Sequence, residues 1–171
     1  MIQKTIHVCA LGDLDSTAKA LGDYRLLTLM SPSHPDESWR HYARHAHLHL
    51  AFNDIIAPQD GLVAPDAAMI EAIVDFGCDA SATLPLLIHC WAGISRSSAA
   101  AYIIACAGHP GREHELAQTL RHRAPFVTPN ALMVALADDL LTCDGRMVAA
   151  IAGIGRGEEA FAGTPYVMPL T

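Results

Sequence analysis

The sequence is short of charged residues, of paired cysteines and of long apolar runs. Only 17% of its 171 residues are charged and 51% are hydrophobic, which excludes the disordered and low-complexity classes. The five cysteines are odd in number and show no paired short spacing, which indicates reduced thiols rather than a disulfide framework. No charged-then-apolar leader opens the chain, so we expect a cytoplasmic setting.

No stretch has the roughly 20 apolar residues that a membrane helix needs. The two most apolar stretches, 97–108 and 131–141, are too short or are interrupted by Asp138 and Asp139. Basic residues are also few, since 11 Lys and Arg stand against 18 Asp and Glu to give a net charge of −7. This charge opposes broad binding to nucleic acid or anionic membranes. We therefore expect a soluble protein with neither as a partner, in which any polyanion meets a focused local site.

The hydrophobic pattern predicts a single domain over residues 1–171. A domain of this length buries roughly 70% of the surface of its unfolded chain. Short β-rich segments alternate with segments of helical spacing, which predicts an α/β fold with a central, mostly parallel sheet flanked by helices. The expected strands are 5–11, 25–30, 45–52 and 83–88, and the expected helices are 17–21, 67–77, 98–107, 112–123, one capped by Thr128 and Pro129 that ends at 141, and a short one at 147–151 before a Gly- and Pro-rich tail.

The segment after the fourth expected strand has the order that an anion-binding turn requires. His89 and Cys90 end the strand, residues 91–95 form a turn, and Arg96 begins a helix. Such a turn aims successive backbone N–H groups into one concavity, and the helix N-terminus adds positive charge. Gly93 permits a backbone conformation closed to other residues, and the arginine offers a bidentate fork to a tetrahedral oxyanion. The same field stabilises a thiolate, which predicts a cysteine nucleophile at neutral pH.

The signature 89–97 resembles that of the cysteine-dependent protein tyrosine phosphatases. Ser95, directly before the arginine, and the short chain are similar to the compact dual-specificity branch. The resemblance extends upstream to 48–54 and downstream to 123–130, so that it covers roughly residues 25–140. It implies a phosphatase-like fold with a strand–phosphate loop–helix active site.

The resemblance also implies roles for individual residues. Cys90 attacks phosphorus to form a cysteinyl-phosphate, and Asp54 protonates the leaving oxygen and then activates water for the second displacement. No metal or other cofactor is needed. Ser97 would hydrogen-bond the sulfur, His89 would orient the loop from behind, and Asn130 would support it from outside the phosphate contacts. The groups that would hold the equatorial oxygens are the Arg96 side chain and the backbone N–H groups of Trp91, Ala92, Gly93, Ile94, Ser95 and Arg96.

The general acid has more than one candidate. Asp54 follows the expected strand 45–52, but Asp60 and Asp66 lie in the same loop region, where an aspartate can simply cap a turn or helix. Asp66, directly after Pro65, fits the first turn of a helix, where the helix dipole favours a carboxylate. We prefer Asp54 and keep Asp60 as the alternative.

Four aromatic and imidazole side chains allow two interpretations each. His45, His47 and His49 alternate along a strand and would share one face, either as a polar face or as part of a metal site. No cysteine or carboxylate nearby completes such a site, which favours the polar face. Trp91 points either into the sheet core or toward the substrate rim, where it could stack on a phenyl ring.

Two further features stay open. One of the four other cysteines could lie close enough to Cys90 to form a reversible disulfide on oxidation. Arg121 and Arg123 either attract phosphate or bind the last carbonyls of their helix. The sequence gives no distance with which to decide either question, and it does not reveal the oligomeric state.

We expect a phosphomonoester hydrolase acting on phosphotyrosine or, with dual specificity, on phosphoserine and phosphothreonine as well. Its partner would be a phosphorylated protein or a small phosphomonoester. One alternative is a phosphoinositide phosphatase, although family members with that preference carry basic residues inside the loop, where this chain has Trp91 and Ile94. The other is a phosphate-binding module without turnover, against which the intact Cys90, Arg96 and Ser97 argue.

Overall fold

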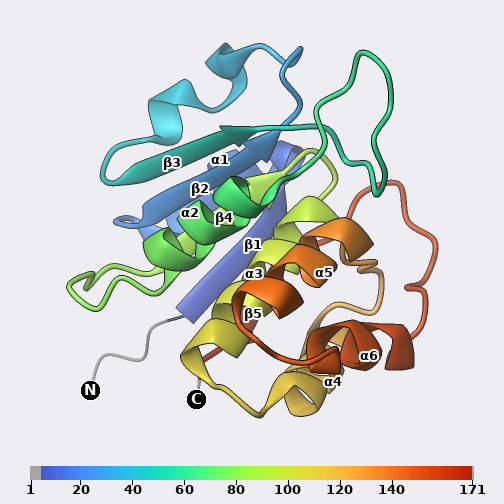
Figure 1. Cartoon of the computed structure of the whole chain (residues 1–171). Helices are drawn as coiled ribbons and strands as arrows, with labels where there is room; N and C mark the ends of the chain where they lie inside the picture. The colour runs from blue at the N-terminus through green and yellow to red at the C-terminus, as the bar shows by residue number, and fades with distance from the viewer. Residues whose placement is uncertain (1–4, 171) are drawn as a thin grey trace.

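Five strands form one sheet that lies between helices on its two faces (Figure 1). The structure is a computed structural model that describes residues 5–170. The strand order is β3-β2-β4-β1-β5, in which the first four strands run parallel and β5 runs antiparallel to β1. This confirms the predicted α/β fold with a mostly parallel sheet. The strands are β1 (Thr5–Ala10), β2 (Arg25–Met30), β3 (His47–Ala51), β4 (Leu86–Cys90) and β5 (Tyr166–Pro169).

Six helices bury both faces of the sheet. Side chains of α1 pack into the apolar cluster on one face, while those of α2 to α6 join the larger cluster on the other. Within residues 5–170, no helix has the length and apolar character that crossing a membrane requires. The helices are α1 (Leu14–Leu21), α2 (Ala67–Gly77), α3 (Arg96–Gly108), α4 (Glu113–Arg123), α5 (Ala131–Leu140) and α6 (Arg146–Gly153), with three 3₁₀ turns at Leu11–Asp13, Asp36–Ser38 and Arg40–Tyr42.

The strand and helix that flank the sequence motif are the most deeply buried elements. Every residue of β2 and β4 is buried, as expected for central strands of a parallel sheet covered on both faces. Helix α3 is buried from Arg96 to Cys106, which explains why it is apolar all round. The motif therefore passes from the central strand into the central helix.

Two element boundaries differ from the sequence prediction for local chemical reasons. Strand β4 begins at Leu86, after Pro85, because proline cannot donate a ladder hydrogen bond. Helix α5 is capped by Asn130 and not by Thr128 and Pro129, since the Asn130 Oδ1 accepts from the Met133 N–H at 3.0 Å.

The tail contains a strand that the sequence analysis missed. Residues 166–169 pair with β1 at the edge of the sheet, and Tyr166 and Met168 are buried there. The neighbouring glycines and prolines hide this strand from local pattern, because its only partner is more than 150 positions away in sequence. The tail is thus part of the sheet.

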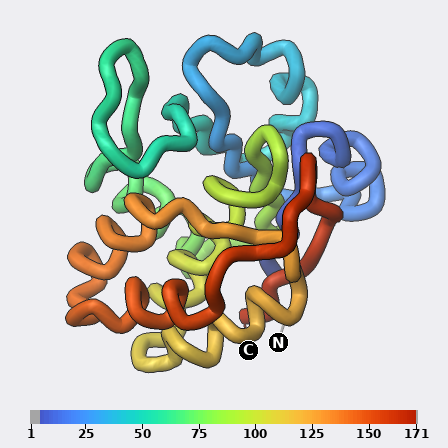
Figure 2. Tube along the Cα trace, turned by 90° about the vertical axis from the view of Figure 1, so that its right-hand side faces the viewer, coloured from blue at the N-terminus to red at the C-terminus, as the bar shows by residue number. Residues whose placement is uncertain are grey.

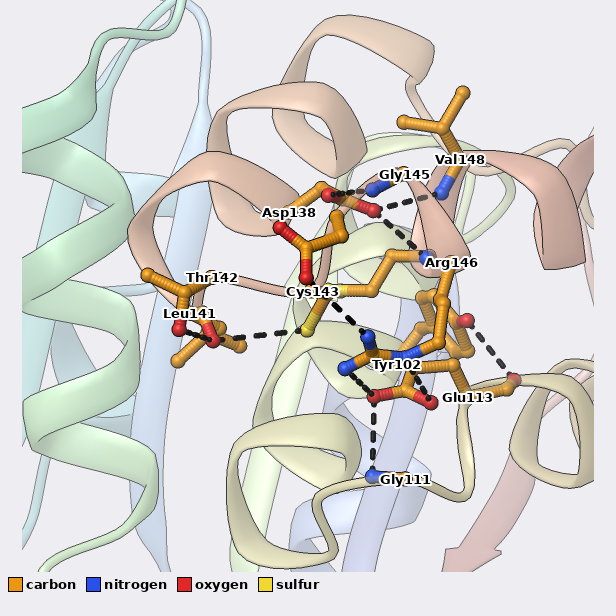
Figure 3. A network of polar contacts seen from close by, with 12 residues as sticks. Tyr102, Gly111, Glu113, Asp138, Leu141, Thr142, Cys143, Gly145, Arg146 and Val148 are labelled. Atoms are coloured by element: carbon orange, nitrogen blue, oxygen red, sulfur yellow. Dashed lines mark hydrogen bonds and ion pairs between the residues drawn. The ribbon is translucent and has the colours of Figure 1, made fainter.

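A polar network fixes α6, from which the tail departs (Figure 3). Asp138 on α5 accepts from the Met147 N–H at 2.7 Å and so caps the start of α6. The nearly fully buried Glu113 of α4 accepts from Arg146 at 3.3 Å, and the backbone carbonyl of Glu113 accepts from the Tyr102 hydroxyl at 2.9 Å. Helices α3 to α6 are therefore joined by hydrogen bonds as well as by apolar packing.

Candidate active site

The turn 91–95 is held in place by hydrogen bonds to its outward-pointing carbonyl oxygens. Four of its carbonyl oxygens accept from backbone N–H groups of other segments. The pairs are Leu11 to Trp91 at 3.1 Å, Gly163 to Ala92 at 2.8 Å, Thr128 to Ile94 at 3.2 Å and Asn130 to Ser95 at 3.2 Å. Because C=O and N–H point in opposite directions across a planar trans peptide, the N–H groups that follow these carbonyls point inward. The turn therefore presents these backbone N–H groups on its inner side.

The Cys90 thiol lies inside this lining. Its Sγ accepts from the Gly93 N–H at 3.2 Å and lies 3.1 Å from the Ser97 Oγ. The residue is 2% exposed. The sulfur therefore lies within hydrogen-bond distance of a backbone N–H of the turn and of a hydroxyl group of α3.

Gly93 is required at its position for two independent reasons. Its φ is +69°, in the left-handed region that disfavours side chains. A Cβ at this position would also lie 2.7 Å from the Ala10 backbone nitrogen. The turn thus closes against the end of β1 only with glycine at 93.

Arg96 is buried at the start of α3 with part of its guanidinium unpaired. Its Nη1 donates to the Phe52 carbonyl at 2.8 Å and to the Ser31 Oγ at 3.2 Å. Its Nε is buried without a hydrogen-bond partner. A buried charged donor without a partner is costly, and an oxyanion held by the adjacent turn would supply that partner.

Asp54, the residue that we predict to be the acid, lies against the same turn. Its Oδ1 accepts from the Ser95 Oγ at 2.7 Å and from the Asn130 Nδ2 at 2.8 Å. The Asn130 Nδ2 also donates to the Ile55 carbonyl at 3.2 Å. One buried amide therefore caps α5 and holds the loop after β3 beside the turn.

The other two candidate acids take different places. Asp66 is the N-cap of α2, where its Oδ1 accepts from the Met69 N–H at 2.9 Å. Asp60 is exposed, and no hydrogen bond or ion pair links its side chain to any residue in the range 5–170. The structure therefore brings Asp54 to the turn and leaves Asp60 in the solvent-exposed part of the loop.

His89 supports the turn from the opposite face of the sheet. Its Nε2 lies 2.9 Å from the Thr28 Oγ1, which in turn lies 3.0 Å from the His47 Nε2. Its Nδ1 lies 3.4 Å from the Cys90 carbonyl oxygen. Burial lowers the pKa of His89 to about 3, so the ring is neutral at physiological pH and serves as a hydrogen-bonding strut.

His45, just before β3, and His47 and His49 within it form a polar face. His45 lies 3.0 Å from an Asp23 carboxylate oxygen, and His49 contacts the edge of Trp39. With His47 bound to Thr28, the three rings are directed to different partners. Among residues 5–170, no three side chains of the metal-binding types are gathered into a site.

Trp91 lies at the rim of the turn and not in the core. It is 46% exposed, and its ring packs edge-on against Phe161 with centroids 5.3 Å apart. This resolves the question that the sequence leaves open.

Cys9 lies on the strand next to that of Cys90 but faces away from it. It pairs in register with His89, so it belongs to the face opposite Cys90 because side chains alternate along a strand. It packs with Leu14 and Tyr24, and burial raises its pKa to about 12. A disulfide between Cys9 and Cys90 would require rotation of a central strand.

Arg121 binds backbone carbonyls and not the turn. Its Nη1 donates to the carbonyls of Pro125 and Val127 at 2.8 Å each, and its Nη2 donates to the Gly155 carbonyl at 2.7 Å. The helix-end alternative therefore holds for Arg121, which also ties the segment after α6 to the segment after α4.

Sequence reasoning missed the groups that hold the site from a distance. Ser31 and the Phe52 carbonyl anchor Arg96, and Thr28 orients His89. A usable signal existed, because carboxyl ends of neighbouring parallel strands meet at one edge, and positions 31 and 52 each directly follow a strand. No local signal in the sequence predicts the contact between Phe161 and Trp91.

Comparison with known proteins gives matches in structure only. Neither a protein-family model nor a curated protein sequence matches the chain. Tk-PTP in its active form is similar with a TM-score of 0.59 and 16% identity, over 83% of this chain and 95% of that one. PTPMT1 in complex with PI(5)P gives 0.62 and 14%, over 86% and 95%. The Yvh1 phosphatase domain from Chaetomium thermophilum gives 0.56 and 16%, over 83% and 93%. The chain thus has the fold of compact, dual-specificity-like cysteine phosphatases, as the resemblance in sequence predicts.

Proposed function

We propose that the chain is a cytoplasmic phosphomonoester hydrolase that acts through a cysteinyl-phosphate on Cys90, with phosphotyrosine in proteins as its main substrate. One observation carries the proposal. The Cys90 sulfur, a lining of inward backbone N–H groups and the unpaired Nε of buried Arg96 converge on one turn. These are the nucleophile and the donors that a phosphoryl group needs.

In the first step, the Cys90 thiolate attacks phosphorus and the bond from phosphorus to the ester oxygen breaks. Asp54, in its protonated form, gives its proton to that oxygen, so the product leaves as an alcohol or phenol. The equatorial oxygens carry the developing charge and receive hydrogen bonds from the N–H groups of the turn and from Arg96.

In the second step, water attacks the cysteinyl-phosphate and passes its proton to the Asp54 carboxylate. The bond between sulfur and phosphorus breaks, and the thiolate departs. The Ser97 hydroxyl, 3.1 Å from the sulfur, hydrogen-bonds the departing anion and so eases this step. Inorganic phosphate and the starting enzyme result.

Phosphotyrosine suits this site better than an inositol phosphate. PTPMT1, which is similar in fold, has been seen in complex with PI(5)P, so the alternative has a structural precedent. In this chain, however, the rim side chains Trp91 and Ile94 are uncharged, and the net charge of −7 opposes approach to anionic lipid or nucleic acid. The same site admits phosphoserine, phosphothreonine and small phosphomonoesters as slower substrates.

Hydrolysis of p-nitrophenyl phosphate by purified enzyme tests the proposal. Wild type is expected to turn over in the presence of a chelator and to be inhibited by vanadate. Cys90→Ser is expected to lose turnover while retaining its circular dichroism spectrum, because an alcohol does not supply the anionic nucleophile. Cys78→Ser, an exposed position at the end of α2, is the matched control and should match wild type. Turnover in Cys90→Ser would contradict the mechanism, and tight phosphate binding by an inactive wild type would favour a binding module.

A further inference from the structure

Residues 154–163, which form most of the segment between α6 and β5, pack along the turn and are here called the strap. Figure 2 shows it, in red, rising beside the yellow-green turn, on the side opposite the green loop of residues 53–65. Its Glu158 N–H donates to the Pro125 carbonyl at 3.0 Å, and its Gly163 N–H donates to the Ala92 carbonyl at 2.8 Å. The strap is therefore bonded directly to the turn that carries Cys90.

Two glycines allow this close approach. A Cβ on Gly157 would overlap the Val127 carbonyl oxygen, and a Cβ on Gly163 would overlap the Phe126 ring. Neither glycine has a positive φ, so contact rather than backbone conformation requires them. The strap therefore packs closely against Phe126 and Val127.

Most of the exposed large apolar side chains belong to the turn or to the two segments beside it, the strap and the loop 53–65. Seven large hydrophobic residues of the described chain are exposed, and five of them belong to the strap, the turn or the loop 53–65. These five are Ile56, Leu62, Val63, Trp91 and Phe161. Phe161 is 84% exposed, the highest of the seven, and its ring contacts the edge of Trp91. Because most of this ring faces solvent on a segment that is bonded to the turn, it is available to a ligand.

The charge of the strap determines which kind of ligand with an apolar group can bind beside it. Glu158 and Glu159 line a groove beside the turn together with Arg156 and Ile94. Two carboxylates against one guanidinium leave the strap acidic, which repels an anionic membrane surface and tolerates a basic peptide. The chemistry therefore favours an aromatic phosphomonoester within a peptide over a lipid headgroup.

We propose, resting on the function proposed above, that Trp91 and Phe161 form the aromatic wall that receives the phenyl ring of phosphotyrosine in a peptide substrate. A third ring packs against an edge-on pair in the offset or T-shaped geometry that aromatic groups prefer. Trp91 directly follows Cys90 in the chain and lies exposed at the rim of the turn, where the substrate ring would pack against it. The strap is then a specificity element for aryl over alkyl phosphates.

The test compares Phe161→Ala with wild type on two peptides of identical sequence, one with phosphotyrosine and one with phosphothreonine. We expect the KM for the phosphotyrosine peptide to rise about 3- to 10-fold, which matches the value of one aromatic contact, with kcat and the phosphothreonine KM unchanged. Phe161→Tyr should restore the wild-type KM. Leu140→Ala, at an exposed apolar position on α5, is the control and should not change either KM.

The outcomes separate this inference from the function on which it rests. A wild type that hydrolyses neither peptide nor p-nitrophenyl phosphate would overturn the proposed function. An active wild type whose Phe161→Ala variant keeps its KM on both peptides would overturn only the aromatic wall. Equal loss on both peptides would show that Phe161 merely holds the strap. Faster hydrolysis of a phosphatidylinositol monophosphate in vesicles, lost in Phe161→Ala, would assign the wall to lipid and also contradict the inference.

Discussion

At the scale of single residues, the site is built around a guanidinium that is only half satisfied. Arg96 gives one nitrogen to the Phe52 carbonyl and Ser31, while its buried Nε has no partner. The first two contacts fix the plane of the guanidinium, and the unpaired Nε is left for a ligand. If the proposed function holds, the arginine is thus oriented before phosphate binds, which reduces the entropy lost on binding.

We predict that Arg96→Lys loses kcat/KM for p-nitrophenyl phosphate by about 100-fold or more, although charge is conserved. An ammonium cannot make two parallel hydrogen bonds, and each bond to a charged group contributes about 1.5–3 kcal/mol. Steady-state kinetics check this, with Arg112→Lys as the same substitution at the start of α4, where the guanidinium binds Glu115. Near wild-type kinetics in Arg96→Lys would make the arginine structural.

Asp54 is likewise held by two donors, Ser95 and Asn130. If it is the general acid, Asp54→Asn should reduce kcat on phosphotyrosine by about 10²- to 10⁴-fold, the usual value of acid catalysis. The loss should be smaller on p-nitrophenyl phosphate, whose leaving group needs little protonation. Asp60→Asn should match wild type on both substrates, and the reverse pattern would assign the acid to Asp60.

At the scale of elements, the strap shows where sequence reasoning ends. The four parallel strands and the helices that cover them follow from local hydrophobic spacing, and the anion turn follows from residues 89–97. The strand β5 and the strap do not, because their partners are β1, the turn and the segment 125–128, all distant in sequence. The roles of Ser31 and Thr28 are not predicted by local pattern either, because they arise from contacts between neighbouring strands. Local pattern therefore locates the turn but not the strap that packs beside it.

The fit of the strap predicts unequal effects of two glycine substitutions. Gly157→Ala places a methyl group on the Val127 carbonyl and should lower the free energy of unfolding by about 1–3 kcal/mol, as overpacking does. Gly153→Ala meets nothing within 4 Å at the end of α6 and should raise that free energy by up to about 1 kcal/mol through helix propensity. Urea unfolding measures both, and equal effects would show that the strap is loosely packed.

At the scale of the whole molecule, one sheet includes both the first strand and the last. Strand β5 pairs with β1, and the network of Asp138 and Glu113 joins α4, α5 and α6. Helix α3, which begins at the turn, lies at the centre of the larger apolar cluster. Such connections favour a chain that folds as a single domain, so that loss of the tail strand would also loosen the turn.

We predict one cooperative unfolding transition, with circular dichroism and tryptophan fluorescence coinciding in urea.

The free energy of unfolding should fall between pH 6.5 and about 3, because the pKa of His89 is lowered from 6.5 to about 3 in the fold. In that window the unfolded chain binds a proton that the folded chain excludes, so acid favours unfolding by up to about 1.4 kcal/mol per pH unit. His89→Gln should lose less stability than wild type between pH 6.5 and 5. An equal loss, or two separate transitions, would contradict this description.

The proposed mechanism requires that Cys90 carry the phosphoryl group during turnover. The direct measurement is mass spectrometry of enzyme mixed with a phosphotyrosine peptide and quenched rapidly in acid, followed by mapping of the modified peptide. We expect one added phosphoryl group on the peptide that contains Cys90. This adduct should accumulate further in Asp54→Asn with an aryl substrate whose leaving group departs easily, because water is then poorly activated. Product release with no adduct on Cys90 at any quench time, or an adduct on another residue, would contradict it.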